Sequence, residues 1–357
     1  MLLNILKNSV ISPLISFIIP TLNSAKVLSA CLKSIANQNY LNYEILIVDG
    51  GSTDSTLEIA KRFKCQIIHN PLKSAEAAKA LGLKKVHSKF VALIDSDNIL
   101  PSKNWLQKML LPFKDSEIIG SEPIAFTYRQ NSGFIERYSA LIGANDPFAY
   151  ISGISDRINS IDHQWTHLNL SQENFSSYIK IKLIPKHLLP TIGANGTIFR
   201  TSFLKKYFSG NYLFDIDIIT QALVETQKPL YFAKVKIGII HSFCESSIPK
   251  FIRKQDRRLR DYFTHLHQRS FDYSNNFSDN IFKNVFLLVK NNLYFTLYSL
   301  LLFPSLIDSL RGFFNKPDMA WFFHPFACFI TFWIYFYISI LSLLGVNLTL
   351  NRNKWQQ

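Results

Sequence analysis

The stretch FVALIDSDNIL, from Phe90 to Leu100, decides the fold more than any other part of this 357-residue chain. Its first five residues are continuously apolar, which is typical of a strand buried on both faces. Two carboxylates, Asp95 and Asp97, follow directly. An Asp-x-Asp pair alone is common in solvated turns, but hard divalent cations bind such oxygens and bridge them to phosphates. Because the pair follows a buried strand, we favour cation binding.

The segment before this strand repeats the same pattern. Apolar strands are predicted at 14–19, 44–48 and 65–69, and helices at 26–37, from an N-cap at Ser52 through 63, and at 75–86. Strands that alternate with helices predict an α/β fold, a Rossmann-like and mostly parallel sheet with helices on both faces. Ligands of such sheets bind at the carboxyl ends of the strands. Thr21, Asn23, Asp49 and Asp95 all follow strands, so this edge is the candidate site.

Five segments carry a resemblance to one family. IIPTLN (18–23), ILIVDGGSTDST (45–56) and FVALIDSDNIL (90–100) resemble, in this order and spacing, the family 2 inverting glycosyltransferases with the GT-A fold. IGANGTIFR (192–200) resembles the family's acceptor-side segment, and LFDIDIITQAL (213–223) resembles its acidic catalytic motif. Together they span residues 14 to 260. The resemblance implies a nucleotide-sugar donor and Mg²⁺ or Mn²⁺ as cofactor.

The resemblance also implies roles for single residues. The donor nucleotide would be held by Pro20, Thr21, Asn23, Asp49, Lys79, Asp95 and Ser96, and the metal by Asp97 and His241. The acceptor or the diphosphate would be met by Gly193, Ala194, Asn195, Asp217, Gln255, Arg257 and Arg258. Asp215 would be the general base, a role that contributes roughly 10²–10⁴-fold in rate.

Several of these roles have a purely structural alternative. Asp49 fits a turn that hydrogen-bonds its own backbone, and Asp215 and Asp217 fit the N-terminus of a helix. His241 could be a structural histidine, and Arg257 with Arg258 a solvated basic face.

The chain departs from the family pattern at three places. Phe214 stands where the acidic motif usually has Glu, and Lys79-Ala80 replace an Arg-Asn pair before Gly82. Leu259 replaces the Trp of the Gln-x-x-Arg-Trp motif, which argues against a processive polysaccharide synthase. The insert from 136 to 187 shows no readable pattern and could line an acceptor pocket. A zinc site at His163 and His167 is disfavoured, since no other ligands accompany them.

Net charge indicates the kind of partner, and the cysteines indicate the compartment. The 39 basic and 25 acidic residues give a net charge of +14, which favours anionic partners, but no nucleic-acid motif is present. Much of the charge lies between Lys250 and Arg269, which suits a membrane surface. Four scattered cysteines and an N-terminal apolar run cut by two prolines predict a cytoplasmic catalytic domain without a signal peptide.

The apolar C-terminal part predicts membrane association. We expect a GT-A domain over 1–270, with a nucleotide half over 14–125 and an acceptor half over 126–270, and a membrane-associated helical region over 271–357. Residues 321–346 are long enough to cross a bilayer, whereas 293–310 are marginal. A hairpin with both ends in the cytosol is our preferred interpretation, and a helical pair buried in a soluble domain stays open.

The predicted function is transfer of a sugar from a UDP- or GDP-linked donor, with inversion, to a lipid-linked or polyprenyl-phosphate acceptor. An alternative is transfer to a hydroxyl of a cell-envelope glycan. A phosphate acceptor, already ionised, would need no base. A nucleotidyltransferase is disfavoured because PTLNSAK (20–26) has no glycine-rich loop after the first strand. A membrane-tethered binding protein on an inactive GT-A scaffold is the alternative outside enzymes.

Overall fold

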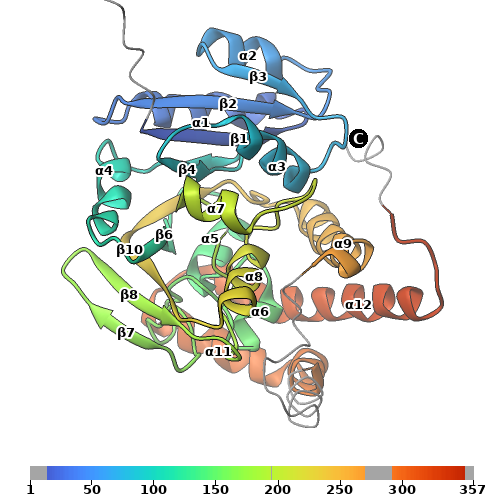
Figure 1. The fold of residues 1–357 in the computed structure, drawn as a ribbon. Coiled ribbons are helices and arrows are strands. Elements are labelled where there is room, and N and C mark those ends of the chain that lie inside the picture. The colour runs from blue at the N-terminus through green and yellow to red at the C-terminus, as the bar shows by residue number, and fades with distance from the viewer. Residues whose placement is uncertain (1–13, 194, 270–291, 350–357) are drawn as a thin grey trace, which may run out of the picture.

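A mixed sheet forms the centre of the molecule in the computed structural model, which describes residues 14–193, 195–269 and 292–349. Within these residues the strand order is β3-β2-β1-β4-β9-β6-β10-β8-β7, and β5 pairs with β10 (Figure 1). The strands are β1 (Ile15–Thr21), β2 (Tyr43–Asp49), β3 (Gln66–His69), β4 (Phe90–Leu93), β5 (Asn98–Ile99), β6 (Ile118–Phe126), β7 (Ser171–Asn174), β8 (Tyr178–Leu183), β9 (Thr197–Arg200) and β10 (Leu230–His241).

Helices cover both faces of this sheet, so the predicted α/β class and its helical layers are confirmed. They are α1 (Ala25–Ala36), α2 (Thr56–Arg62), α3 (Ala75–Lys85), α4 (Trp105–Leu110), α5 (Phe134–Ile142), α6 (Pro147–Ile151), α7 (Thr201–Tyr207), α8 (Asp217–Thr226), α9 (Ile248–Thr264), α11 (Phe303–Asn315) and α12 (His324–Leu343), with 3₁₀ turns η1 (Leu111–Lys114), η2 (Leu266–Gln268) and η3 (Met319–Phe323). Residues 292–301 form a further helix.

The N-terminal half of the sheet is parallel, as predicted. β1 pairs in parallel with both β2 and β4, and β2 pairs in parallel with β3. The expected N-cap at Ser52 is wrong, because α2 begins only at Thr56 after an N-cap at Ser55. The Ser52 hydroxyl instead donates a hydrogen bond to the Asp49 carboxylate, so the loop after β2 closes on itself before the helix starts.

The second half of the sheet is mixed. β9 lies antiparallel between β4 and β6, and β6 runs parallel to β10. The short strand β5 pairs antiparallel with the end of β10, which places His241 opposite Asn98. This pairing brings a residue from the end of β10 beside the Asp95–Asp97 loop, far apart though they are in sequence.

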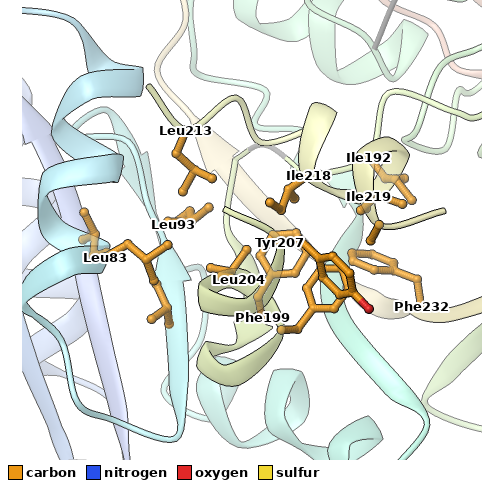
Figure 2. Close-up of a cluster of buried hydrophobic side chains, with 14 of the residues drawn as sticks. Leu83, Leu93, Ile192, Phe199, Leu204, Tyr207, Leu213, Ile218, Ile219 and Phe232 are labelled. Carbon is orange, nitrogen blue, oxygen red and sulfur yellow. The ribbon is translucent and has the colours of Figure 1, made fainter. Parts of the chain in front are cut away.

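Alternating side chains divide the core into two layers, one on each face of the sheet. Ile18, Leu46 and Val48 point to the layer packed by α3, α7 and α8 (Figure 2), whereas Phe17 and Ile47 point to the layer packed by α1, α2 and α4. Both layers are apolar, which explains the continuously apolar strands of the sequence.

The C-terminal helices share a third cluster with the acceptor half. Trp321, Phe323 and Ala327 pack with Tyr138 of α5 and Phe251 of α9. Among the described residues one helix, Met319–Leu343, is long and apolar enough to cross a membrane. The helix 292–301 and α11 pass the same test only as a pair, and they are bent by 79° at Leu302. The domain boundary at 270 stays a prediction.

Candidate active site

An open cleft of ≈ 620 Å³ lies at the carboxyl ends of β1 and β4. It is lined by residues of the nucleotide half, of the insert between 136 and 187, and of α9. Of the predicted site residues it brings together Pro20, Thr21, Lys79, Asp95, Ser96, Asp97, Asn195, Asp215, His241, Arg257 and Arg258. The strand-end argument thus places most of the predicted residues around one cavity.

The loops after β1 and β2 are locked together beneath the cleft. The Asp49 carboxylate accepts hydrogen bonds from the Thr21 hydroxyl (2.8 Å), from the Ser52 hydroxyl and from the backbone N–H groups of Gly51 and Ser52. The amide oxygen of Asn23 accepts from the backbone N–H of Thr53 at 2.7 Å. Asp49 is therefore a turn carboxylate in this state, and neither it nor Asn23 lines the cleft.

A buried ion pair forms one wall of the cleft. The Lys79 ammonium lies 2.5 Å from Oδ2 of Asp215 and 3.7 Å from Oδ1 of Asp95. Burial raises the pKa of Asp215 to about 6, and the nearby Lys79 charge limits the rise. Burial alone would lower the pKa of Lys79, but the carboxylates of Asp215 and Asp95 outweigh it and raise that pKa. Oδ1 of Asp215 is buried and has no hydrogen-bond partner among the described residues.

Asp97 lines the cleft between a histidine and a lysine. Its Oδ2 is 3.4 Å from Nε2 of His241 and 3.4 Å from Nζ of Lys254. Burial alone would raise the pKa of Asp97, but its interactions with His241 and Lys254 outweigh burial and hold the pKa well below its usual range. Its Oδ1 is buried without a hydrogen-bond partner in the described part of the chain.

Asp97 and His241 fit a divalent cation that also binds phosphate. The unpartnered Oδ1 of Asp97 is an available oxygen ligand, and His241 offers a nitrogen beside it. No group of three His, Cys, Asp or Glu side chains with metal-ligand geometry occurs among the described residues. Mg²⁺ commonly takes only one or two protein carboxylates and completes its shell with water and substrate phosphates, so a two-residue site suffices.

Asn145 holds His241 from the opposite side of the ring. Its amide Nδ2 lies 3.1 Å from Nδ1 of His241, while its Oδ1 is buried without a partner among the described residues. The amide group of Asn145 can occupy this place in either of two orientations. The turned orientation would pair Oδ1 with an Nδ1–H and leave Nε2 free for a metal. Gln255, fully buried, donates to the Asn145 carbonyl at 2.9 Å, so its place is beneath the site and outside the cleft.

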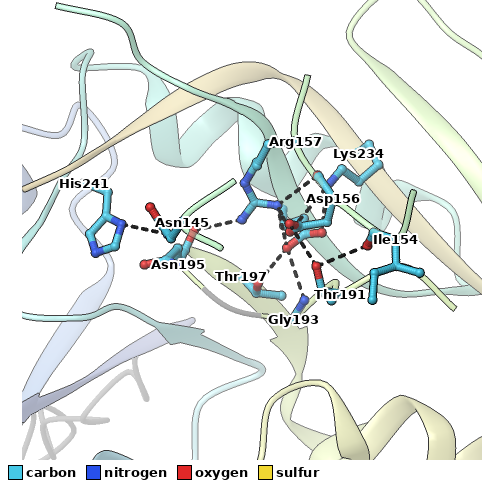
Figure 3. A network of polar contacts seen from close by, with 11 residues as sticks. Asn145, Ile154, Asp156, Arg157, Thr191, Gly193, Asn195, Thr197, Lys234 and His241 are labelled. Atoms are coloured by element: carbon cyan, nitrogen blue, oxygen red, sulfur yellow. Dashed lines mark hydrogen bonds and ion pairs between the residues drawn. The ribbon is translucent and has the colours of Figure 1, made fainter. Parts of the chain in front are cut away.

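A buried network of four charges supports the acceptor-side loop (Figure 3). Glu122 accepts from Lys234 at 2.7 Å and from Arg157 at 3.0 Å, and Asp156 also contacts Arg157. Burial lowers the pKa of Lys234 to about 8 against the opposing charge of Glu122. Two positive and two negative groups balance, which is what allows charges to remain buried at this depth.

This network holds the segment between Gly193 and Thr197. The backbone N–H of Gly193 and the hydroxyl of Thr197 both donate to Glu122 at 3.2 Å, and Arg157 donates to the Asn195 carbonyl at 3.4 Å. A Cβ on Gly193 would meet the Asp215 carbonyl oxygen at 2.7 Å. The Gly193 segment and Asp215 are therefore in direct contact, as the resemblance implied for residues of one site. Ala194 lies outside the described residues.

Other predicted residues lie at the rim. Asp217 is the first residue of α8, and its carboxylate accepts two hydrogen bonds from the Arg269 guanidinium, at 3.0 and 3.2 Å. Arg269 lines the cleft, whereas Asp217 does not. Arg258 lies 3.5 Å from Oδ2 of Asp146, and Arg257 is exposed. His167 pairs with Asp162 at 2.7 Å, so the disfavoured zinc site gains no further support.

Sequence reasoning missed several residues that line the cleft. Asn145, Asp146, Asp156 and Arg157 lie in the insert where no pattern was readable, and Lys73, Lys254 and Arg269 were not singled out. A signal existed for Lys254, which stands one position before Gln255 in the basic segment. The insert carried none, because its contacts reach the site only through tertiary packing.

Comparison with known proteins agrees with this fold. The family model described as "Glycosyl transferase family 2" matches residues 16–208. The chain is 30% identical over 138 residues to glycosyltransferase AglE of Haloferax volcanii, covering 36% of this chain and 45% of that protein. It is 33% identical over 116 residues to glycosyltransferase GlyG of Streptococcus pneumoniae, covering 30% and 38%. The matches thus span less than half of each relative.

Among solved structures, the mannosyltransferase PcManGT of Pyrobaculum calidifontis, in complex with GDP-Man and Mn²⁺, has a TM-score of 0.51 at 13% identity. The match covers 94% of this chain and 88% of that one. The fold is thus that of the GT-A glycosyltransferases, the class that the sheet and the strand-end cleft define. The family match extends over more than half of the sequence, and the chain belongs to glycosyl transferase family 2.

Proposed function

We propose that this protein transfers a sugar, with inversion, from a nucleoside-diphosphate sugar to a lipid-linked or polyprenyl-phosphate acceptor with the help of Mg²⁺ or Mn²⁺. The observation that carries the proposal is the arrangement of Asp97 with His241 and of Asp215 with Lys79 in one cleft at the strand ends. The acidic and basic groups of such a cleft suit a diphosphate and its cation.

The donor would lie over the ends of β1 and β4. Pro20, Thr21, Asp95 and Ser96 line this part of the cleft and would meet the nucleoside and ribose. Asp49 would act through Thr21, which it holds at 2.8 Å. Lys254, Arg257, Arg258 and Arg269 on the opposite wall would contact the diphosphate, where cationic side chains stabilise developing charge.

Asp97 and His241 would hold the cation between them. A bound divalent ion would neutralise the negative charge that develops on the departing nucleoside diphosphate. Lys254, now 3.4 Å from Asp97, would turn from this carboxylate to the diphosphate, and Asn145 would fix the ring of His241. The complex of PcManGT with GDP-Man and Mn²⁺ makes that donor and that ion the first pair to test.

Asp215 would remove the proton from an acceptor hydroxyl. Its pKa of about 6 leaves it mostly ionised at neutral pH yet basic enough to accept a proton. The buried, unpartnered Oδ1 provides the accepting atom, while Oδ2 stays with Lys79. A lipid-linked or envelope glycan would present such a hydroxyl, whereas a polyprenyl phosphate, already ionised, would need no base. Asp156, Thr191 and Asn195 line the adjoining part of the cleft, where the acceptor would bind.

The proposed place of action is the cytoplasmic side of a membrane. The apolar helix Met319–Leu343 and the basic helix α9, which it packs against, support attachment of the protein to membrane lipids. Attachment would hold the cleft close to a lipid-linked acceptor.

The first test is donor turnover by detergent-purified protein, with UDP- and GDP-sugars and Mn²⁺ or Mg²⁺. We expect metal-dependent release of one nucleoside diphosphate, lost in Asp97→Ala and kept in Asp256→Ala, whose carboxylate pairs with Arg260 on α9 outside the cleft. Silence across the panel, with no nucleotide binding by calorimetry, would favour the inactive-scaffold alternative.

The acceptor is tested by offering a polyprenyl phosphate and an alkyl glycoside to the wild type and to Asp215→Asn. Transfer to the glycoside should fall by roughly 10²–10⁴-fold without the base, whereas transfer to an ionised phosphate should survive. The anomeric configuration of the product, read by NMR, tests inversion directly.

A further inference from the structure

The C-terminal helices expose a large apolar surface. Six of its side chains define what we call the apolar face, namely Leu301, Phe303, Phe314, Phe326, Trp333 and Phe336. Phe314 is 78% exposed and Trp333 47%. So many large apolar side chains exposed on neighbouring helices of a folded chain indicate a binding surface for protein or membrane.

The helix α12 is docked along most of its length. His324, Ala327, Thr331 and Ile338 are fully buried, and their spacing of three, four and seven residues places them on one side of the helix. Phe326, Phe329, Trp333 and Phe336 are spaced in the same way on the other side and are exposed. The helix is therefore two-sided, one side against the domain and one side apolar and open.

Polar bonds fasten the docked side. The imidazole of His324 lies 2.7 Å from the Tyr138 hydroxyl and 2.9 Å from the Tyr298 hydroxyl. Tyr335 donates to Asp146 at 2.7 Å. If α12 crossed a bilayer, it would have to break these hydrogen bonds or carry their polar partners into the hydrocarbon. Each polar group left without a partner there costs several kcal/mol, so crossing is unfavourable.

The charges around this region suit an anionic surface. Its two described carboxylates are turned inward: Asp308 accepts from Tyr298 at 2.7 Å and Asp318 from Arg137 at 2.8 Å. The side chain of Arg311 is 68% exposed and pairs with Asp308 at 3.5 Å, and that of Lys250 is 47% exposed and lies 3.9 Å from Glu245. Arg253 and Arg257 on α9 are exposed as well. Helices with an apolar side and nearby basic groups lie in the interface of membranes that contain anionic lipids.

We propose that the apolar face seats in the plane of an anionic bilayer surface, with α12 lying in the interface instead of crossing it. This differs from the hairpin expected from the sequence. The helix α9 packs on α12 and supplies Lys254, Arg257 and Arg258 to the cleft. One side of the cleft is therefore formed by α9, which packs directly on the proposed interfacial helix α12. The inference depends on the fold and holds whichever sugar is transferred.

Vesicle flotation tests the surface. The wild type should float with phosphatidylglycerol-containing vesicles and much less with pure phosphatidylcholine. The Trp333→Ser/Phe336→Ser variant should bind at least roughly tenfold more weakly, since two half-exposed rings leave the bilayer. Leu41→Ser, 78% exposed on the nucleotide half, is the matched control and should bind as the wild type. Equal binding by all three proteins, or a variant that loses only self-association, would overturn the proposal.

Cysteine labelling tests the orientation. Starting from Cys65→Ser, since the other three cysteines are buried, single cysteines are placed by Met319→Cys, Asn347→Cys and Leu41→Cys. In sealed membrane vesicles an impermeant maleimide should label all three from the same side. Labelling of positions 319 and 347 from opposite sides would show a spanning helix and refute the interfacial one. Neither experiment measures sugar transfer. The results of flotation and of labelling can therefore be interpreted even if the proposed transfer reaction is not observed.

Discussion

Replacement of Lys79 by Met tests whether the buried ion pair tunes the pKa of Asp215, the proposed general base. Lys79 is the cation 2.5 Å from the Asp215 carboxylate, and it offsets the burial that raises the pKa of Asp215 to about 6. A unit charge at ~4 Å and an effective dielectric constant of about 20 contributes ~4 kcal/mol, or at most about three pKa units. We expect a rise of about one to two units once the cation is removed.

The sign of this effect follows from the charge of the base. A carboxylate with pKa near 6 is about nine-tenths ionised at pH 7, whereas one with pKa near 8 is about one-tenth ionised. Lys79→Met should therefore lower kcat/KM about twofold to tenfold at pH 7, for a rise of one to two units, and recover much of it at pH 9. The measurement is the pH dependence of kcat/KM for transfer to a hydroxyl acceptor, with thermal unfolding as a control for the fold.

Two results would refute this reasoning. An acidic limb that stays near pH 6 in Lys79→Met would show that the titrating group is not Asp215. A uniform loss at every pH would assign Lys79 to direct contact with the donor. The variant Asp215→Asn should lack the limb altogether, which identifies the group.

Three further substitutions probe separate parts of the site. Lys254→Gln should strengthen binding of Mn²⁺ alone, because the ammonium 3.4 Å from Asp97 no longer competes, while donor binding weakens; calorimetry that shows both weakened would contradict this. Glu122→Gln should lower the free energy of unfolding by about 3–5 kcal/mol in denaturant titrations, because Arg157 and Lys234 stay buried; a neutral effect would show that they rearrange. Gly193→Ala should cost activity by displacing Asp215, whereas Gly210→Ala, at a similarly positive φ but in open space, should cost only stability; equal activity loss would make backbone strain the cause.

The parallel half of the sheet could be predicted because its information is local. Strands β1, β2 and β4 each contain a short apolar run, and a polar residue stands at the end of the strand or within two positions after it. Parallel strands end on the same side, so Thr21, Asp95 and Asp97 had to meet. The hydrogen bonds of these side chains could not be predicted. The Asp49 carboxylate, for example, accepts bonds from two backbone N–H groups of its own loop.

The acceptor side could be anticipated only through the family resemblance, because its residues meet through pairings distant in sequence. His241 reaches Asp97 only because β5 pairs with the end of β10. Asp156 and Arg157 come from a segment without regular periodicity and are fixed by Glu122 and Lys234 on two other strands. Nothing in a window of neighbouring residues reports such contacts.

The structure links two of the departures from the family pattern. Phe214, in place of the usual Glu, lies in an aromatic group: its ring is 5.5 Å from that of His265 and 4.8 Å from the guanidinium of Arg269. The cleft therefore has one carboxylate, Asp215, where the motif usually has two. Lys79, in place of the usual Arg, pairs with that carboxylate from a buried position. Its ammonium also lies 3.7 Å from Asp95, so one cation serves both carboxylates of this wall. The changes at 79 and 214 therefore both alter the charge around Asp215.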